Sequence, residues 1–374
     1  NNPNPRKQVF SGYEQWNTVQ KLRFKPSEGL DLQYTFYYGG TGVTPRYDRL
    51  IEMRNGTLRF AEWNYGPMLW RMHTLSASLL KKNALYDGAK LVVGYQNYEE
   101  SRIDRQRNNA NRRSQLEQVV MWTGNFDATK QMGKGEMFYG LEMVTNDVGS
   151  TANSININTG AVTKVATRYP NGSSWNSFGA YANYRLNFHP KFTANAGVRY
   201  NYAIVKATFN SQFFPFPFKD ANIKDGAVTG NLGLVYRPAT SWQFNANVST
   251  GFRVPNIDDI GKLFESTPGN LTVPNPNLRS EYAWNGEVGA VKHLPGKLRI
   301  ELNAFYTLLN NAIVRRPTTF NGQDSLVYDN VKSRVESLQN VGKATVWGLQ
   351  AVAEVWLNSQ VSLYTMANYI TGKE

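Results

Sequence analysis

The densest group of residues able to do chemistry in this chain of 374 residues is a set of arginines between positions 102 and 113. A guanidinium group donates paired hydrogen bonds to carboxylates and phosphates, so several of them together can hold an anion. Two interpretations stay open: the set captures an anionic ligand, or it is a solvated rim whose charges also pair with lipid phosphates. The arginines are Arg102, Arg105, Arg107, Arg112 and Arg113.

A second unusual feature is a run of phenylalanines and prolines at positions 213–218. Exposed apolar patches often mark binding surfaces, so the rings could contact an apolar or aromatic ligand. Alternatively, they fold inward and pack on neighbouring loops. We treat the four aromatic residues of the run as candidate ligand-binding residues beside the arginines: Phe213, Phe214, Phe216 and Phe218.

Catalytic and metal-binding chemistry has little support in the sequence. The chain has no cysteine, which excludes thiolate, zinc–thiolate and iron–sulfur sites. Of its histidines, His189 and His293 fall at short turns, so a histidine pair for haem is not expected. The acidic pair Asp258-Asp259 fits a solvated turn better than a calcium site, and no phosphate-binding glycine loop is present. We predict no catalytic residue, no metal site and no bound cofactor, and therefore a protein that is not an enzyme.

The elements that must position these residues are strands. In residues 178–188 and 192–204 every second position is apolar, and the positions between them mostly hold asparagine, glycine and arginine. Residues 242–253 and 298–307 repeat the pattern. A period of two over such lengths indicates strands with one face in an apolar medium and the other in water. The net charge of +13 does not indicate nucleic-acid binding, because the arginines alternate along strands or cluster in one segment.

The strands are long enough to cross a membrane. Soluble strands run to about 5–6 residues, whereas strands of membrane barrels need about 9–11 to cross the hydrocarbon. Aromatic residues stand near the ends of the apolar series, as in the girdles of such barrels: Phe188, Phe192, Tyr236 and Trp242 near the turns, with Tyr200, Tyr202 and Phe252 at the far ends. The sequence therefore predicts an all-β fold, a transmembrane antiparallel β-barrel with about fourteen strands visible, over a soluble sandwich or propeller.

The connections alternate between short and long, as in barrels whose short turns face the periplasm and whose long loops lie outside the cell. The predicted short turns lie at 26–29, 83–88, 131–133, 189–190, 238–241, 294–296 and 358–359. The predicted long loops lie at about 39–66, 105–113, 148–173, 210–225, 254–280 and 317–337. The arginine set and the phenylalanine run both fall in or beside the long loops, where binding residues are expected.

One region goes beyond a generic barrel. From Ser249 the chain reads STGFRVPNIDDIGKLFESTPGNLTVPNPNLRSEYAWNGEVG. It resembles TonB-dependent outer-membrane receptors, in which a Phe-Arg-x-Pro box closes one strand and an Asn-Pro-Asn-Leu box leads from a long loop into a Glu-bearing strand. Arg253 has the polar parity of its strand, so we expect it to point into the barrel and include it among the candidate ligand-binding residues. The boxes are Phe252, Arg253 and Pro255, then Asn275, Pro276, Asn277 and Leu278.

The resemblance implies a barrel of twenty-two strands filled by an N-terminal plug, in the outer membrane of a Gram-negative bacterium, working with TonB and contacting outer-membrane lipid and lipopolysaccharide. No plug-like segment precedes the first strand, and the last residues lack the usual terminal aromatic. We therefore expect residues 1–374 to be the internal part of a barrel, without the plug and without about four strands at each end.

The family takes up ferric siderophores, haem or cobalamin. The segment 254–274 lacks the histidine that haem receptors usually carry there, and the basic charge fits an anionic ferric siderophore. We therefore expect active import of a ferric siderophore, with cobalamin or haem as alternatives. The rivals from other classes are a passive pore of about fourteen strands and an adhesin-like barrel that only binds a partner.

Overall fold

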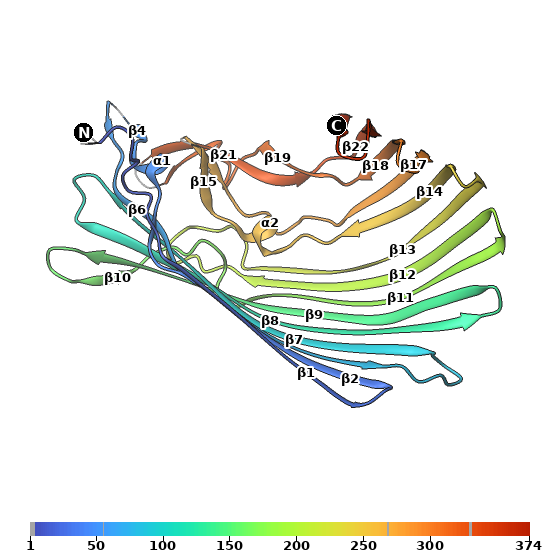
Figure 1. Cartoon of the computed structure of the whole chain (residues 1–374). Coiled ribbons are helices and arrows are strands. Elements are labelled where there is room, and N and C mark those ends of the chain that lie inside the picture. Colours follow the sequence, from blue (N-terminus) through green and yellow to red (C-terminus); the bar gives the residue numbers. More distant parts are fainter. Residues whose placement is uncertain (1–3, 55, 268, 329–330) are drawn as a thin grey trace.

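The computed structural model describes residues 4–54, 56–267, 269–328 and 331–374. Its main feature is one antiparallel sheet in which fourteen strands follow one another in chain order, which confirms the predicted fold class and strand number. The sheet is curved, with long loops at one end, tight turns at the other, and α2 on its concave side (Figure 1). Among the described residues no helix is both long and apolar enough to cross a membrane.

The main strands, in order, are β1 (Gln15–Ser27), β2 (Leu30–Thr41), β6 (Phe60–Leu79), β7 (Gly88–Gln106), β8 (Asn111–Met132), β9 (Gly135–Asn156), β11 (Ser173–His189), β12 (Phe192–Thr208), β13 (Asp220–Ala239), β14 (Trp242–Arg253), β17 (Glu281–Leu294), β18 (Leu298–Asn310), β22 (Lys343–Trp356) and β23 (Ser362–Lys373). The first loop holds β3 (Thr44–Pro45), α1 (Tyr47–Leu50), β4 (Met53–Arg54) and β5 (Thr57–Leu58). The later loops hold β10 (Val162–Lys164), α2 (Ile257–Gly261), β15 (Phe264–Thr267), β16 (Asn270–Thr272), β19 (Ile313–Pro317), β20 (Ser325–Tyr328) and β21 (Val331–Asn340).

The short connections lie where the sequence predicts them, but one long loop does not exist. The expected loop at 105–113 is wrong, because β7 continues to Gln106 and β8 begins at Asn111. Likewise β9 runs to Asn156, beyond the predicted loop start at 148. The reason is that cross-strand pairs such as Asp104 with Arg113 continue the ladder past the apolar part of the strands. Strands β7 to β9 therefore project further at the loop end than β14 and β18.

The two faces of the sheet follow the alternation in the sequence. Val198, Leu232 and Val288 lie on the convex outer face and are each more than half exposed, as expected for side chains that meet lipid. The side chains at the intervening positions of the strands include the asparagines, and they point to the concave side. There the glycines make room for them: a Cβ at Gly197 would lie 2.3 Å from the Oδ1 of Asn231. The inner wall is therefore a layer of amide side chains over glycine backbone.

Aromatic residues form rows on the outer face near both ends of the strands. At the turn end Phe192 stacks on Tyr236 with ring centroids 4.5 Å apart. The second row lies further toward the loops, where the ring centroid of Tyr95 in the middle of β7 is 4.8 Å from that of Trp122 on β8. Phe252, predicted to belong to the far row, instead packs partly buried against the core of the loops. Apart from that residue, these rows agree with the predicted girdles.

The loops have a small sheet and a hydrophobic core of their own. Strands β15, β16, β19, β20 and β21 form a five-stranded sheet in which β16 runs parallel to β21. Its side chains meet the phenylalanine run in a buried cluster made of Phe214, Leu263, Leu271, Val273, Phe320 and Val335. This folded cap lies over the concave face at the loop end (Figure 1).

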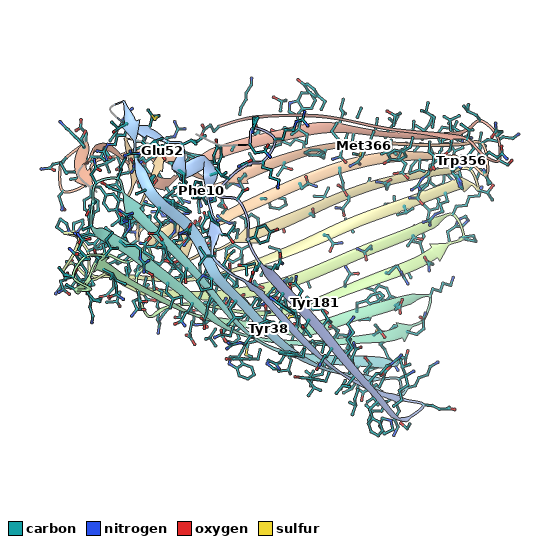
Figure 2. All side chains as sticks on the ribbon, turned by 60° about the vertical axis from the view of Figure 1, so that its left-hand side comes forward. Phe10, Tyr38, Glu52, Tyr181, Trp356 and Met366 are labelled. Atoms are coloured by element: carbon teal, nitrogen blue, oxygen red, sulfur yellow. The ribbon has the colours of Figure 1, made fainter. Side chains whose placement is uncertain are left out.

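The first loop joins the cap through a buried ion triad. Arg59 pairs with Glu52 at 2.6 Å and with Glu265 of β15, and its side chain is 6% exposed. Figure 2 places Glu52 at the crowded loop end, opposite Trp356 at the turn end. Segments far apart in the chain are therefore held together above the sheet.

Candidate ligand-binding site

At the loop end of the sheet, the arginine of the Phe-Arg-x-Pro box connects three elements through two ion pairs, which we call the clamp. Arg253, the last residue of β14, donates to Asp259 of α2 and to Glu281 of β17, each at 2.6 Å. Asn256 caps α2, since its side chain accepts from the Asp259 N–H at 2.9 Å and Asp259 accepts from the Asn256 N–H in return. The clamp thus fixes both the start and the end of the loop 254–280. Pro255, the second residue of that loop, is fully buried.

The Asn-Pro-Asn-Leu box anchors the same loop to its neighbour. The Nδ2 of Asn275 donates to the carbonyl oxygen of Leu338 at 2.8 Å, and Leu278 is buried in the loop core. Glu281 also accepts from the N–H of Ile313 at 2.7 Å. Both motif boxes therefore hold the loop 254–280 to its neighbours, and the guanidinium of Arg253 is already bound by two carboxylates.

Helix α2 is docked on the loop that follows β10. Asp258 accepts from the phenol of Tyr169 at 2.7 Å and pairs with Lys262 at 2.8 Å. Burial alone would raise the pKa of Asp258, but the hydrogen bonds from Lys262 and Tyr169 outweigh it, so the pKa is lowered. Burial, with the nearby Asp258, raises the pKa of Tyr169 to about 12. The pair Asp258-Asp259 is thus committed to ion pairs and hydrogen bonds within the protein.

The five arginines do not converge on one site. Arg102 lies on the inner face between Glu100 and Glu117, and Arg113 lies on the same face with Asp104 at 2.9 Å. The opposite parity places the other strand arginines on the outer face.

On that outer face the Nη1 of Arg105 donates to the carbonyl oxygen of Asn109 at 3.1 Å, and Arg112 is 3.9 Å from Glu62. Arg107 is exposed in the turn between β7 and β8. Arg105 stands ten residues beyond Tyr95, which is roughly 33 Å of strand. The outer arginines therefore lie above the aromatic row rather than beside it.

The phenylalanine run packs inward and also lines a cavity. Phe214 is buried, with its ring centroid 5.4 Å from that of Phe320, and Phe218 lies 4.8 Å from Phe209. Phe213 is 39% exposed. Three of the four rings, those of Phe213, Phe214 and Phe216, face a cavity of about 590 Å³.

This cavity brings together residues that no local pattern connects. Its walls come from the outer end of β9, the segment after β10, the phenylalanine run and the end of α2. The sequence does not indicate that the segment after β10 belongs to the cavity, because only the docking of distant loops brings it there. The lining residues are Ser150, Thr151, Ala152, Asn153, Lys164, Val165, Ala166, Thr167, Arg168, Tyr169, Pro170, Asn171, Thr208, Phe209, Asn210, Gln212, Phe213, Phe214, Phe216, Gly261 and Leu263.

Comparison with known proteins gives one family. Over residues 1–373 the chain matches the family described as TonB dependent receptor-like, beta-barrel. The vitamin B12 transporter BtuB of Vibrio vulnificus (strain YJ016) is 33% identical over 90 residues, which are 24% of this chain and 13% of BtuB.

Two solved structures share the fold. The copper transporter OprC superposes with a TM-score of 0.77 at 13% identity, over 96% of this chain and 53% of OprC. A double mutant of the Serratia marcescens hemophore receptor HasR, in complex with its hemophore HasA and heme, gives 0.72 at 13% identity, over 97% of this chain and 55% of HasR. The chain spans about half the length of these structures.

Proposed function

We propose a function from one premise: this chain belongs to the TonB-dependent receptor family, as a β-barrel of the outer membrane of a Gram-negative bacterium. Members of this family are receptors and transporters rather than enzymes. We propose that the whole protein binds a scarce nutrient at its extracellular loops and imports it actively with energy delivered through TonB. In this proposal the chain performs no catalytic step.

The nutrient we propose is a ferric siderophore. The observation that carries this choice is the cavity among the extracellular loops. It is lined by aromatic rings and by Lys164 and Arg168, and by no carboxylate of the residues that the structure describes. Such a lining favours a ligand with aromatic surface and negative charge. The absence of histidine from residues 254–274 counts against haem. Cobalamin remains the second candidate, because the BtuB relative is a vitamin B12 transporter.

We also propose that residues 1–374 are the internal part of a larger barrel. Within the described chain, β1 and β23 are the sheet's two edges and do not pair with each other. An unpaired edge in lipid leaves N–H and C=O groups without partners, so only closed barrels are stable there. Further strands would close the sheet around a plug that contacts TonB.

Growth on defined iron sources tests the function. Deletion of the gene should abolish growth on one ferric siderophore as the sole iron source and leave growth on haem unchanged, and the intact gene should restore it. A strain with a control substitution in a periplasmic turn, Lys134→Gln, should grow normally. Unchanged growth of the deletion strain on every siderophore would refute the iron proposal. Loss of cobalamin-dependent growth in that strain would replace it with import of cobalamin.

A further inference from the structure

The cavity beside the phenylalanine run is preformed by tight contacts between its walls. Gly261 at the end of α2 packs so closely that a Cβ there would lie 2.7 Å from the Cδ of Pro170. The N–H of Leu263 donates to the carbonyl oxygen of Arg168 at 3.2 Å, and the N–H of Ser150 donates to the Oδ1 of Asn171 at 2.9 Å. The cavity therefore exists before any ligand arrives, and its volume lies within the range of about 300–1,000 Å³ typical of ligand pockets.

The charges of the cavity have one sign. Lys164 and Arg168 line it, and among the described residues no aspartate or glutamate does. The Nε of Arg168 donates to the phenol of Tyr169 at 3.3 Å, and its guanidinium lies 5.1 Å from the ring of Phe264. It also interacts with Glu117, so part of its charge is neutralised from outside the cavity.

Lys164 is the cation available to a ligand. Its side chain is exposed on β10 and forms no ion pair within the described ranges of the chain. An ammonium group without an acidic partner gives up little when it binds an anion, since no existing ion pair has to break. Lys164 can therefore contribute charge-assisted hydrogen bonds to a ligand that fills the cavity.

The opposite wall supplies aromatic surface. Phe214 and Phe216 are packed into the loop core with ring centroids 5.1 Å apart, so they form a fixed surface. Phe213 is more exposed than either and can cover a ligand. The side-chain amide of Gln212 lies on the same lining and has no hydrogen-bond partner among the described residues, so it is free to donate to a bound group, whereas the Gln212 N–H donates to the Oδ1 of Asn210. Aromatic rings favour flat partners, because stacking keeps most of the two surfaces in contact.

We propose that this cavity binds a planar aromatic group that carries a negative charge, with its ring against Phe213 and its anionic oxygens toward Lys164. The inference deepens the proposed function, because such a group would be the part of the imported ligand that the loops recognise first. It assigns a role to Lys164 and Gln212, which the sequence pattern did not single out.

Ligand-observed NMR on the purified full-length receptor tests the proposal with three probes. Benzoate carries both features, cyclohexanecarboxylate has the charge without the ring, and benzyl alcohol has the ring without the charge. We expect benzoate to bind at least about fivefold more tightly than either of the others, because each lacks one contact worth about 1 kcal/mol. Equal affinity for all three probes would overturn the proposal.

Two substitutions separate the contacts. Lys164→Gln should weaken benzoate about fivefold and leave benzyl alcohol unchanged, whereas Phe213→Leu should weaken both aromatic probes and leave cyclohexanecarboxylate unchanged. Both residues are exposed enough for the barrel to tolerate these changes, and Lys134→Gln in the turn before β9 is the matched control. Benzoate binding that neither substitution weakens would overturn the proposal. The growth assay tests the proposed function separately from this site. A receptor that binds benzoate normally but does not support siderophore-dependent growth would refute import of iron and leave the proposed site intact.

Discussion

Replacement of Arg253 by methionine tests whether the Phe-Arg-x-Pro box is a clamp. Methionine keeps the length and the apolar contacts of the stem but removes both hydrogen bonds to Asp259 and Glu281. The two carboxylates are 11% and 12% exposed, and the arginine is 48% exposed. A fully buried pair costs about 3–5 kcal/mol to break and an exposed pair about 1 kcal/mol or less. For this intermediate case we expect local opening of the loop 254–280 to become easier by about 2 kcal/mol.

The assay is hydrogen exchange of the loop amides in the purified receptor. A change of about 2 kcal/mol corresponds to exchange roughly 30-fold faster in residues 256–263, with the strands of the sheet unchanged. The control is Arg279→Met in the same loop, since the Arg279 side chain is exposed and forms no ion pair within the described parts of the chain. Equal exchange in the Arg253→Met variant and the control would refute the clamp.

Further predictions concern the loop core, the inner wall and pH. Phe214→Ala should lower the free energy of unfolding of the loop cap by about 3 kcal/mol, measured by protease sensitivity of residues 313–340, because it leaves a void beside Phe320. Gly197→Leu should lower the melting temperature of the barrel more than Ala196→Leu, since only the former places a Cβ against Asn231. The contacts of Asp258 stabilise the loops above its ordinary pKa of 3.8 and are lost as the pH falls through its lowered pKa. Loop protection should therefore persist at pH 5 and disappear only well below pH 4.

The strands could be predicted because their signal is local. Alternation in residues 192–204 predicts which side chains meet lipid and which meet the inner face. The structure agrees, since Val198 and Tyr200 are more than half exposed on the outer face and a Cβ at Gly197 would meet Asn231 on the inner face. A turn such as His189-Pro190 needs only neighbouring residues. These features depend on sequence neighbours, so the fold class and the number of strands followed from them.

The loop end could not be predicted, because its order depends on contacts between distant residues. The extension of β7 and β8 rests on pairs such as Arg102 with Glu117, and apolar periodicity does not report them. Within the buried ion triad, the contact between Arg59 and Glu265 joins residues 206 positions apart. For the same reason the sequence does not show that the pleat divides the arginines between two faces, or that Lys164 lines the cavity.

Uptake of ⁵⁵Fe-labelled siderophore by cells with and without TonB tests the central claim most directly. Active import by a TonB-dependent receptor predicts saturable uptake that requires both this protein and TonB, and that stops when a protonophore dissipates the proton gradient. Uptake that rises linearly with concentration and persists without TonB would contradict it and would identify a passive pore.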